Sequence, residues 1–272
     1  MYHDFYRFNE HPFNVTADPD FFFSSKGHSD AISNLEYGIE SRKGILVVTG
    51  EIGTGKTTLC RKLLKQAAQT VKFALILNPN FSELQLLQMI VSDLGIKTKQ
   101  KNKFGLVRAL NEYLLVESDK GNNVVLIVDE AQNLSVNQLE QIRLLSNLET
   151  EKEKLLQIIL VGQPELYEKL QLVKLRQLRQ RVAVHFHLRP LESTDIKYYI
   201  QHRLAKAVHP TYENQHVIFT AQAVEAIYQH TKGSPRSINI LCDRALLAGF
   251  VAETYSIDQA IIDSCTQEVV IS

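Results

Sequence analysis

Short runs of consecutive apolar residues alternate with amphipathic segments over the first two thirds of the chain. The apolar runs are rich in Val, Ile and Leu and are bounded by turn or acidic residues, as buried strands are. They predict strands over residues 45–49, 73–77, 124–128, 156–161 and 182–186. Helical periodicity around them predicts helices over residues 30–39, 56–69, 82–94, 106–117 and 135–148. Strands that alternate with helices predict an α/β fold with a parallel five-stranded sheet flanked by helices on both faces.

From about residue 188 the pattern changes to helices alone. Helical periodicity covers residues 193–207, 220–230, 235–251 and 257–269 with no predicted strand between them, and Pro190 marks the change. The sequence therefore predicts an α/β domain over 1–188 and a small all-helical domain over 189–272. The first 30 residues have no clear period but contain six Phe. We expect this segment to pack against a folded body, because six Phe in solvent would favour aggregation.

Charge and cysteine content limit the classes of partner and compartment. Lys and Arg total 30, as do Asp and Glu, so the formal net charge is zero. This balance disfavours a whole-surface polyanion binder but not a local basic patch. The three cysteines, Cys60, Cys242 and Cys265, are far apart and fit neither a disulfide framework nor a zinc site. No transmembrane segment or signal peptide is predicted. We expect a cytoplasmic chain, or the cytoplasmic part of an inner-membrane protein.

A phosphate-binding motif follows the first predicted strand. The residues match G-x-x-x-x-G-K-[ST] and read Gly50-Glu51-Ile52-Gly53-Thr54-Gly55-Lys56-Thr57. Glycines let such a loop wrap around phosphates with its N–H groups pointing inward, and the helix that follows adds its positive end. In this motif Lys56 contacts the β- and γ-phosphates, and the Thr57 hydroxyl binds Mg²⁺. We predict that these residues and the adjacent Thr58 bind ATP or ADP with Mg²⁺. The alternative is a glycine-rich turn without a ligand.

Two carboxylates, Asp129 and Glu130, end the third predicted strand. An Asp at such a strand end can hold Mg²⁺ through water, and the neighbouring Glu can then act as general base toward the attacking water. Alone, an Asp-Glu pair is often a solvated turn, but the phosphate loop earlier in the chain favours the functional interpretation. The pair predicts hydrolysis, because a protein that only binds nucleotide would not use Glu130 as a general base.

Several further segments carry a family resemblance. They read Tyr6-x-Phe8-x-x-x-Pro12-Phe13-x-x-x-x-Asp18-Pro19-x-x-Phe22, Asp129-Glu130-Ala131-Gln132, Val161-Gly162-Gln163-Pro164-Glu165-Leu166, Leu178-Arg179-Gln180-Arg181-Val182 and Gly233-Ser234-Pro235-Arg236. Together with the phosphate loop, they resemble the AAA+ P-loop ATPases. More narrowly, they are similar to the ExeA/GspA group of general secretion pathway ATPases, to which MshM-like pilus ATPases are related. The resemblance covers essentially the whole chain and implies that the helical domain is a lid over the nucleotide.

The resemblance also implies roles for three kinds of polar residue. Gln163 is similar to the sensor that contacts the γ-phosphate or the attacking water; the alternative is a turn-capping side chain. Arg179 or Arg181 resembles the arginine finger that reaches a neighbouring subunit's γ-phosphate, unless both pair with local acids. Arg236, at the start of a lid helix, resembles the second sensor, although an Arg on such a helix is usually a surface residue.

The opening segment has an implied role as well. Pro12 and Phe13 lie where proteins of this group cover the adenine base. For Phe13, a simple core position is the competing interpretation.

Two groups of basic residues remain. Lys97, Lys99, Lys101 and Lys103 alternate with other residues between two predicted helices, as in a solvated loop; contact with DNA or another anionic surface is the alternative. His185 and His187 alternate on one predicted strand without a Cys or acidic partner at metal-binding spacing. We interpret the histidines as structural.

These features favour a Mg²⁺-dependent ATPase that couples ATP binding and hydrolysis to assembly of a secretion or pilus apparatus. It is expected to act as a nucleotide-dependent homo-oligomer, a ring, with an assembly protein as its partner. One alternative is a DNA-binding AAA+ regulator resembling the MuB and TnsC transposition ATPases, which the neutral charge disfavours. Another is a nucleotide-gated interaction module with negligible turnover, which the acidic pair disfavours. Full-length ExeA/GspA proteins continue into a transmembrane helix and a peptidoglycan-binding domain, so we expect a stand-alone relative or an ATPase portion.

Overall fold

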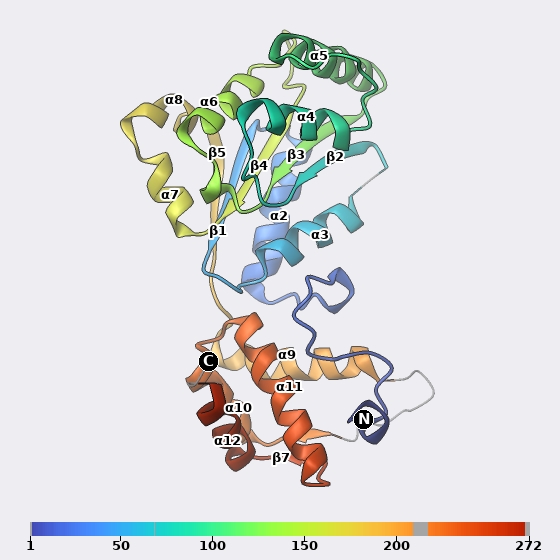
Figure 1. The fold of residues 1–272 in the computed structure, drawn as a ribbon, viewed down its shortest axis with the longest axis vertical. Coiled ribbons are helices and arrows are strands. Elements are labelled where there is room, and N and C mark those ends of the chain that lie inside the picture. The colour runs from blue at the N-terminus through green and yellow to red at the C-terminus, as the bar shows by residue number, and fades with distance from the viewer. Residues whose placement is uncertain (1, 68, 209–216, 270–272) are drawn as a thin grey trace. The chain divides into compact units, whose positions relative to one another are not determined.

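The computed structural model describes residues 2–67, 69–208 and 217–269 (Figure 1). The chain forms two compact units. The α/β unit comprises Lys26–Glu51 and Lys56–Leu188, and the helical unit comprises Met1–Ser25, Ile52–Gly55 and Arg189–Ser272, each within the described ranges. The chain passes from the α/β unit to the helical unit after Leu188. Among the described residues, no helix is long and apolar enough to cross a membrane.

A five-stranded parallel sheet is the centre of the α/β unit, as the sequence predicts. Its strands are β1 (Ile45–Gly50), β2 (Val71–Ile76), β3 (Asn123–Val128), β4 (Gln157–Gly162) and β5 (Val182–Leu188). The order across the sheet is β2-β3-β4-β1-β5, and every pair is parallel. All residues of β1, β3 and β4 are buried, which explains why these strands read as unbroken apolar runs.

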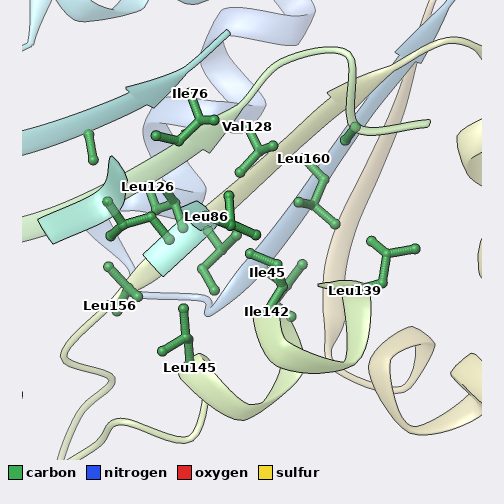
Figure 2. Packing of buried hydrophobic residues seen from close by; sticks show 14 of the residues in the cluster. Ile45, Ile76, Leu86, Leu126, Val128, Leu139, Ile142, Leu145, Leu156 and Leu160 are labelled. Carbon is green, nitrogen blue, oxygen red and sulfur yellow. The ribbon is translucent and has the colours of Figure 1, made fainter. Parts of the chain in front are cut away.

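Helices cover both faces of this sheet. They are α2 (Lys26–Glu40), α3 (Lys56–Gln66), α4 (Glu83–Asp93), α5 (Lys103–Asp119), α6 (Val136–Leu145), α7 (Pro164–Leu170) and α8 (Arg176–Arg179). Alternate strand residues such as Ile45 and Leu126 face an apolar cluster with Leu86 of α4 and Ile142 of α6 (Figure 2). The residues that alternate with these on β1 and β3 point to the opposite face of the sheet and are also buried. On that face α2 and α3 pack on β1, and Gly38 of α2 lies against the Leu46 side chain.

Side-chain caps set where the helices over this cluster begin. Ser82 forms a capping box with Gln85 at the start of α4, and Ser135 forms one with Gln138 at the start of α6. Asn102 caps α5 by accepting a hydrogen bond from the Gly105 N–H group at 2.8 Å. Because of this cap, α5 begins at Lys103, one turn before the start at residue 106 that periodicity predicts.

In its described residues, the helical unit contains four longer helices and two very short strands. The helices are α9 (Ser193–Ala207), α10 (Ala221–Thr231), α11 (Pro235–Val251) and α12 (Gln259–Val269), and the N-terminal segment adds α1 (Tyr2–Tyr6) and the 3₁₀ helix η1 (Pro19–Phe21). The strands β6 (Ile218–Phe219) and β7 (Ser256–Ile257) pair in parallel. The prediction that no strand lies between these helices is therefore wrong in detail, because two-residue strands are too short to produce a period. Residues 209–216 and 270–272 of the predicted domain lie outside the described residues.

The aromatic N-terminal segment packs within the helical unit. Five of its buried aromatic residues are part of that unit's apolar cluster: Tyr2, Tyr6, Phe8, Phe13 and Phe21. Arg203 of α9 is only 6% exposed and lies over the Phe21 ring at 4.7 Å. Its guanidinium donates to the Pro12 carbonyl at 2.6 Å and the Asn14 carbonyl at 2.9 Å. The segment therefore packs against a folded body as expected. Its partners belong to the helical unit, however, whereas the sequence predicts the segment as part of the α/β domain over 1–188.

Candidate nucleotide site

Three neighbouring strands place the predicted chemistry at one edge of the sheet. The phosphate loop follows β1, Asp129 and Glu130 follow β3, and Gln163 follows β4. Because β4 lies between β3 and β1 and all three are parallel, their carboxyl ends meet at the same edge. This edge is where α/β sheets bind ligands. The fold thus brings together segments that are far apart in the sequence.

Lys56 is the first residue of α3, and its side chain folds back over the start of the loop. Its ammonium donates to the carbonyl oxygens of Gly50 at 2.7 Å and Glu51 at 2.8 Å. An ammonium has three donors, so these two bonds leave one for a phosphate oxygen. Burial lowers the pKa of Lys56, and the nearby Glu130 and Asp129 carboxylates act in the opposite direction. Lys56 is therefore a fixed cation in a desolvated position.

The tip of the loop, Ile52–Gly55, belongs to the helical unit. Gly53 and Gly55 have φ values of +79° and +95°, which glycine tolerates and other residues rarely adopt. The Gly53 carbonyl accepts a hydrogen bond from the Arg236 N–H group, in the first turn of α11, at 3.2 Å. A Cβ atom on Gly53 would lie 2.7 Å from the Arg236 Cβ, so this approach also requires glycine. Within the helical unit, then, Arg236 lies beside the loop tip; its role as second sensor stays a prediction.

Thr57 and Asp129 form the candidate metal site. The Thr57 hydroxyl donates to Asp129 Oδ2 at 2.6 Å, and the Glu130 N–H donates to Asp129 Oδ1 at 2.9 Å. Asp129 is 3% exposed, and this burial raises its pKa, opposed by the two donors. A hydroxyl and a carboxylate are the hard oxygen ligands that Mg²⁺ prefers, with substrate phosphates and water completing its shell. The residues present therefore fit Mg²⁺. No cluster of three or more potential His, Cys, Asp or Glu ligands occurs in the described part of the chain.

Glu130 is held in an unusual backbone conformation. Its φ of 52° and ψ of 37° are left-handed, a region that costs a non-glycine residue roughly 1–2 kcal/mol. Its carboxylate oxygen Oε2 accepts from the Gln132 amide at 2.5 Å and from the Gln163 amide at 3.4 Å. Gln163 therefore lies beside the predicted general base, and its role as sensor stays a prediction.

Gln132 is a site residue that the sequence analysis did not assign. It lies in the 3₁₀ helix η2 (Ala131–Asn133), and its side-chain oxygen accepts from the Gln163 backbone N–H at 3.0 Å. The Asp129-Glu130-Ala131-Gln132 pattern was the sequence feature that included this residue. Nothing in that pattern indicates that Gln132 contacts Gln163, 31 positions away.

The remaining predicted residues lie in different settings. Arg179, at the end of α8, is exposed and donates to the Gln171 side chain at 2.6 Å. Arg181 is half-buried and donates to the Ser146 hydroxyl at 3.3 Å. Thr58 follows Thr57 on α3 and is half-buried.

Pro12 and Phe13 lie in the helical unit, and both are buried. Phe13 is 1% exposed and contacts the Phe219 ring edge-on. Contact of these two residues with adenine stays a prediction.

The two strand histidines contact β1 just before the loop. The buried Thr49 hydroxyl lies 2.9 Å from His185 Nε2 and 3.0 Å from His187 Nδ1. Tyr167 of α7 stacks on the His185 ring. Burial and the neighbouring His187 lower the pKa of His185. These contacts are those of residues that join β5 to β1.

Comparison with known families agrees with this geometry. Residues 39–170 match a family described as AAA domain. The chain is 39% identical over 275 residues to general secretion pathway protein A of Aeromonas hydrophila, a match that covers 99% of this chain and 48% of that protein. It is 26% identical over 159 residues to ATP-dependent target DNA activator B of Escherichia phage Mu, covering 57% of this chain and 47% of the relative. The chain spans about half the length of the first of these relatives.

Solved structures share the fold of this chain. The Aeropyrum pernix ORC2 protein superposes with a TM-score of 0.69 at 17% identity, covering 96% of this chain and 72% of that one. The Thermotoga maritima RuvB branch migration motor superposes with a TM-score of 0.60 at 17% identity, covering 94% and 72%. The predicted AAA+ fold and the resemblance to general secretion pathway protein A are therefore confirmed.

The buried charge of Asp129 leads to a prediction about stability. We expect Asp129→Asn to raise the free energy of unfolding at neutral pH and to remove any Mg²⁺-dependent rise in melting temperature. The folded-state pKa of Asp129 is raised, so its ionised form destabilises the fold above that pKa. This penalty disappears as the pH falls below the unfolded-state value of about 3.9. Urea unfolding should therefore show a gain at pH 7 that shrinks toward pH 4.

Asp119→Asn is a suitable control, because Asp119 is exposed at the end of α5. It should change stability little at either pH. A less stable Asp129→Asn protein at pH 7 would contradict the prediction.

Proposed function

We propose that this chain is a Mg²⁺-dependent ATPase whose ATP hydrolysis drives assembly of a secretion or pilus apparatus. The observation that carries the proposal is the meeting of Lys56, the Thr57–Asp129 pair and the Glu130 carboxylate at adjoining strand ends. Binding a nucleotide needs the first two of these features. The third adds a proton acceptor, which only turnover requires.

Each group has a defined part in the proposed reaction. The loop N–H groups and Lys56 bind the phosphates, and bound Mg²⁺, held by Thr57 and Asp129, would offset charge on the β- and γ-phosphate oxygens. Glu130 accepts a proton from water as the water oxygen bonds to the γ-phosphorus. The bond between that phosphorus and the β–γ bridging oxygen breaks, giving ADP and inorganic phosphate. Gln163 shares the Glu130 oxygen with Gln132 and would orient the water.

The coupling to secretion rests on similarity. General secretion pathway protein A of Aeromonas hydrophila is 39% identical over 99% of this chain. An assembly component is the partner that this similarity supports.

Glu130→Gln separates binding from chemistry. The amide can still hydrogen-bond water but cannot take its proton, so kcat should fall about 10²–10⁴-fold. ATP affinity, measured by isothermal titration, should stay unchanged. The matched control is Glu168→Gln, since Glu168 is an exposed carboxylate on α7; it should turn over like the wild type. Wild-type turnover by Glu130→Gln would identify another residue as the base.

We further propose that activity requires self-association, with Arg179 as the arginine finger. Arg179 is exposed on α8 and its partner is a neutral, exposed side chain. Arg181 is half-buried against Ser146 and feels the Glu149 carboxylate. Release from Gln171 would cost little, so Arg179 is better suited to reach the γ-phosphate of another copy of the chain.

Mixing two inactive variants tests this arrangement. Arg179→Ala should lose about 10³–10⁵-fold in kcat, because a trans arginine offsets transition-state charge. Lys56→Ala should lose nucleotide affinity. Mixed together, the two should recover activity, since one supplies an intact site and the other an intact arginine. Arg181→Ala is the control and should retain most activity. Failure of the mixture to exceed either variant alone would contradict a shared site.

A second candidate function is ATP-dependent DNA binding. The specific observation in its favour is the similarity to the phage Mu protein named as a target DNA activator. The chain offers a local basic surface, because Lys97, Lys99 and Lys101 are exposed and have no ion pair among the described residues, and Phe104 beside them is 80% exposed. Lysines bind phosphates, and an exposed aromatic ring can stack on a base.

Salt dependence distinguishes this candidate. If the surface binds duplex DNA, changing Lys97, Lys99 and Lys101 together to Gln should weaken binding. It should also reduce the slope of log K against log salt by up to about three. Lys152, Lys174 and Lys197 are exposed elsewhere, and changing them to Gln is the matched control. Fluorescence anisotropy with ATP present measures both. Equal binding by the two triple variants would rule out this surface.

A further inference from the structure

The Gln132 side chain connects the proposed general base to the end of the next strand. Its amide N–H group donates to Glu130 Oε2 at 2.5 Å, while its amide oxygen accepts from the Gln163 backbone N–H at 3.0 Å. An amide presents one donor end and one acceptor end, so both are used. Gln132 therefore bridges the segment that follows β3 and the segment that follows β4.

Both amide donors near Glu130 reach the same carboxylate oxygen. Gln132 and, at 3.4 Å, Gln163 donate to Oε2. No hydrogen bond to Oε1 occurs among the described residues. A carboxylate oxygen that accepts two donors is the poorer proton acceptor of the pair, because its lone pairs are engaged. Oε1 is therefore the oxygen left to receive a proton.

The backbone around Gln132 is fixed from the other side. Lys169 of α7 donates to the carbonyl oxygens of Gln132 and Leu134, the latter at 2.9 Å. At the end of β4, a Cβ atom on Gly162 would lie 2.7 Å from the Gln132 amide oxygen and 3.0 Å from Leu166. The glycine thus leaves the space that the amide occupies. These contacts restrict the Gln132 side chain to the geometry in which it reaches both partners.

We propose that Gln132 is a positioning residue that orients the Glu130 carboxylate so that Oε1 faces the attacking water. The inference rests on the proposed ATPase function and adds a group that the phosphate loop and the acidic pair do not contain. Gln132 touches neither substrate nor reacting atoms in this role, because it acts through Glu130. Because the same amide also accepts from the Gln163 N–H group, a displacement of the Gln163 backbone would change the orientation of the Glu130 carboxylate.

Two substitutions separate the ends of the amide. Gln132→Ala removes both contacts, whereas Gln132→Glu keeps an acceptor for the Gln163 N–H but replaces the donor with a second carboxylate facing Glu130. Hydrogen bonds to charged groups contribute enough that their loss should lower kcat by about 10- to 100-fold in both variants. KM for ATP and ATP affinity by isothermal titration should stay within about twofold. Asn133→Ala, a change at an exposed neighbour in the same 3₁₀ helix, should leave kcat unchanged.

A double-mutant cycle supplies the decisive readout. If Gln132 acts through the Glu130 carboxylate, adding Gln132→Ala to Glu130→Gln should lower kcat no further. A general structural role would instead multiply the two losses. Multiplied losses, a rise in KM that accounts for the defect, or full kcat in both Gln132 variants would each overturn the proposal. Absence of turnover in the wild type would overturn the proposed ATPase itself, which distinguishes the two failures.

Discussion

The buried carboxylate of Asp129 is the constraint on which the candidate site depends. A carboxylate at 3% exposure must recruit donors, and its two are the Thr57 hydroxyl and the Glu130 N–H. The first bond joins the start of α3 to the end of β3 and so fixes the phosphate loop relative to the acidic pair. The second belongs to the left-handed turn at Glu130. One desolvated charge thereby organises both the candidate metal ligands and the position of the proposed general base.

Most of the α/β fold could be predicted because its signals are local. The strands are buried on both faces and read as apolar runs, and α9 and α11 have the bounds that their periodicity predicts. The misses have physical causes. The Asn102 cap extends α5 beyond its apolar stripe. Helix α7, beginning with Pro164, has only seven residues, too few to show a helical period.

The candidate site also contains residues that short motifs predict and residues that only the fold reveals. Lys56, Thr57, Asp129 and Glu130 could be predicted because each motif is a short run with fixed spacing. Gln132 could not, because its role depends on the pairing of strands that places Gln163 beside it and on a missing Cβ at Gly162. The aromatic N-terminal segment was predictable as buried. Its partner was not, because the buried Arg203 that holds it lies in a distant helix.

The charges at the strand ends give the physical reason for proposing an additional cation. Among the described side chains that meet there, Lys56 is the cation, while Asp129 and Glu130 are anions. A triphosphate adds further negative charge, and charge shifts onto its leaving oxygens during hydrolysis. Two of the three N–H donors of the Lys56 ammonium already bond to loop carbonyl oxygens. In the proposed reaction, bound Mg²⁺ and another cation would supply the balance. Among the described residues, the exposed Arg179 bonds to the neutral Gln171 side chain and not to an acid. This charge balance is the physical reason for the proposed trans arginine, which would add a cation when copies of the chain meet.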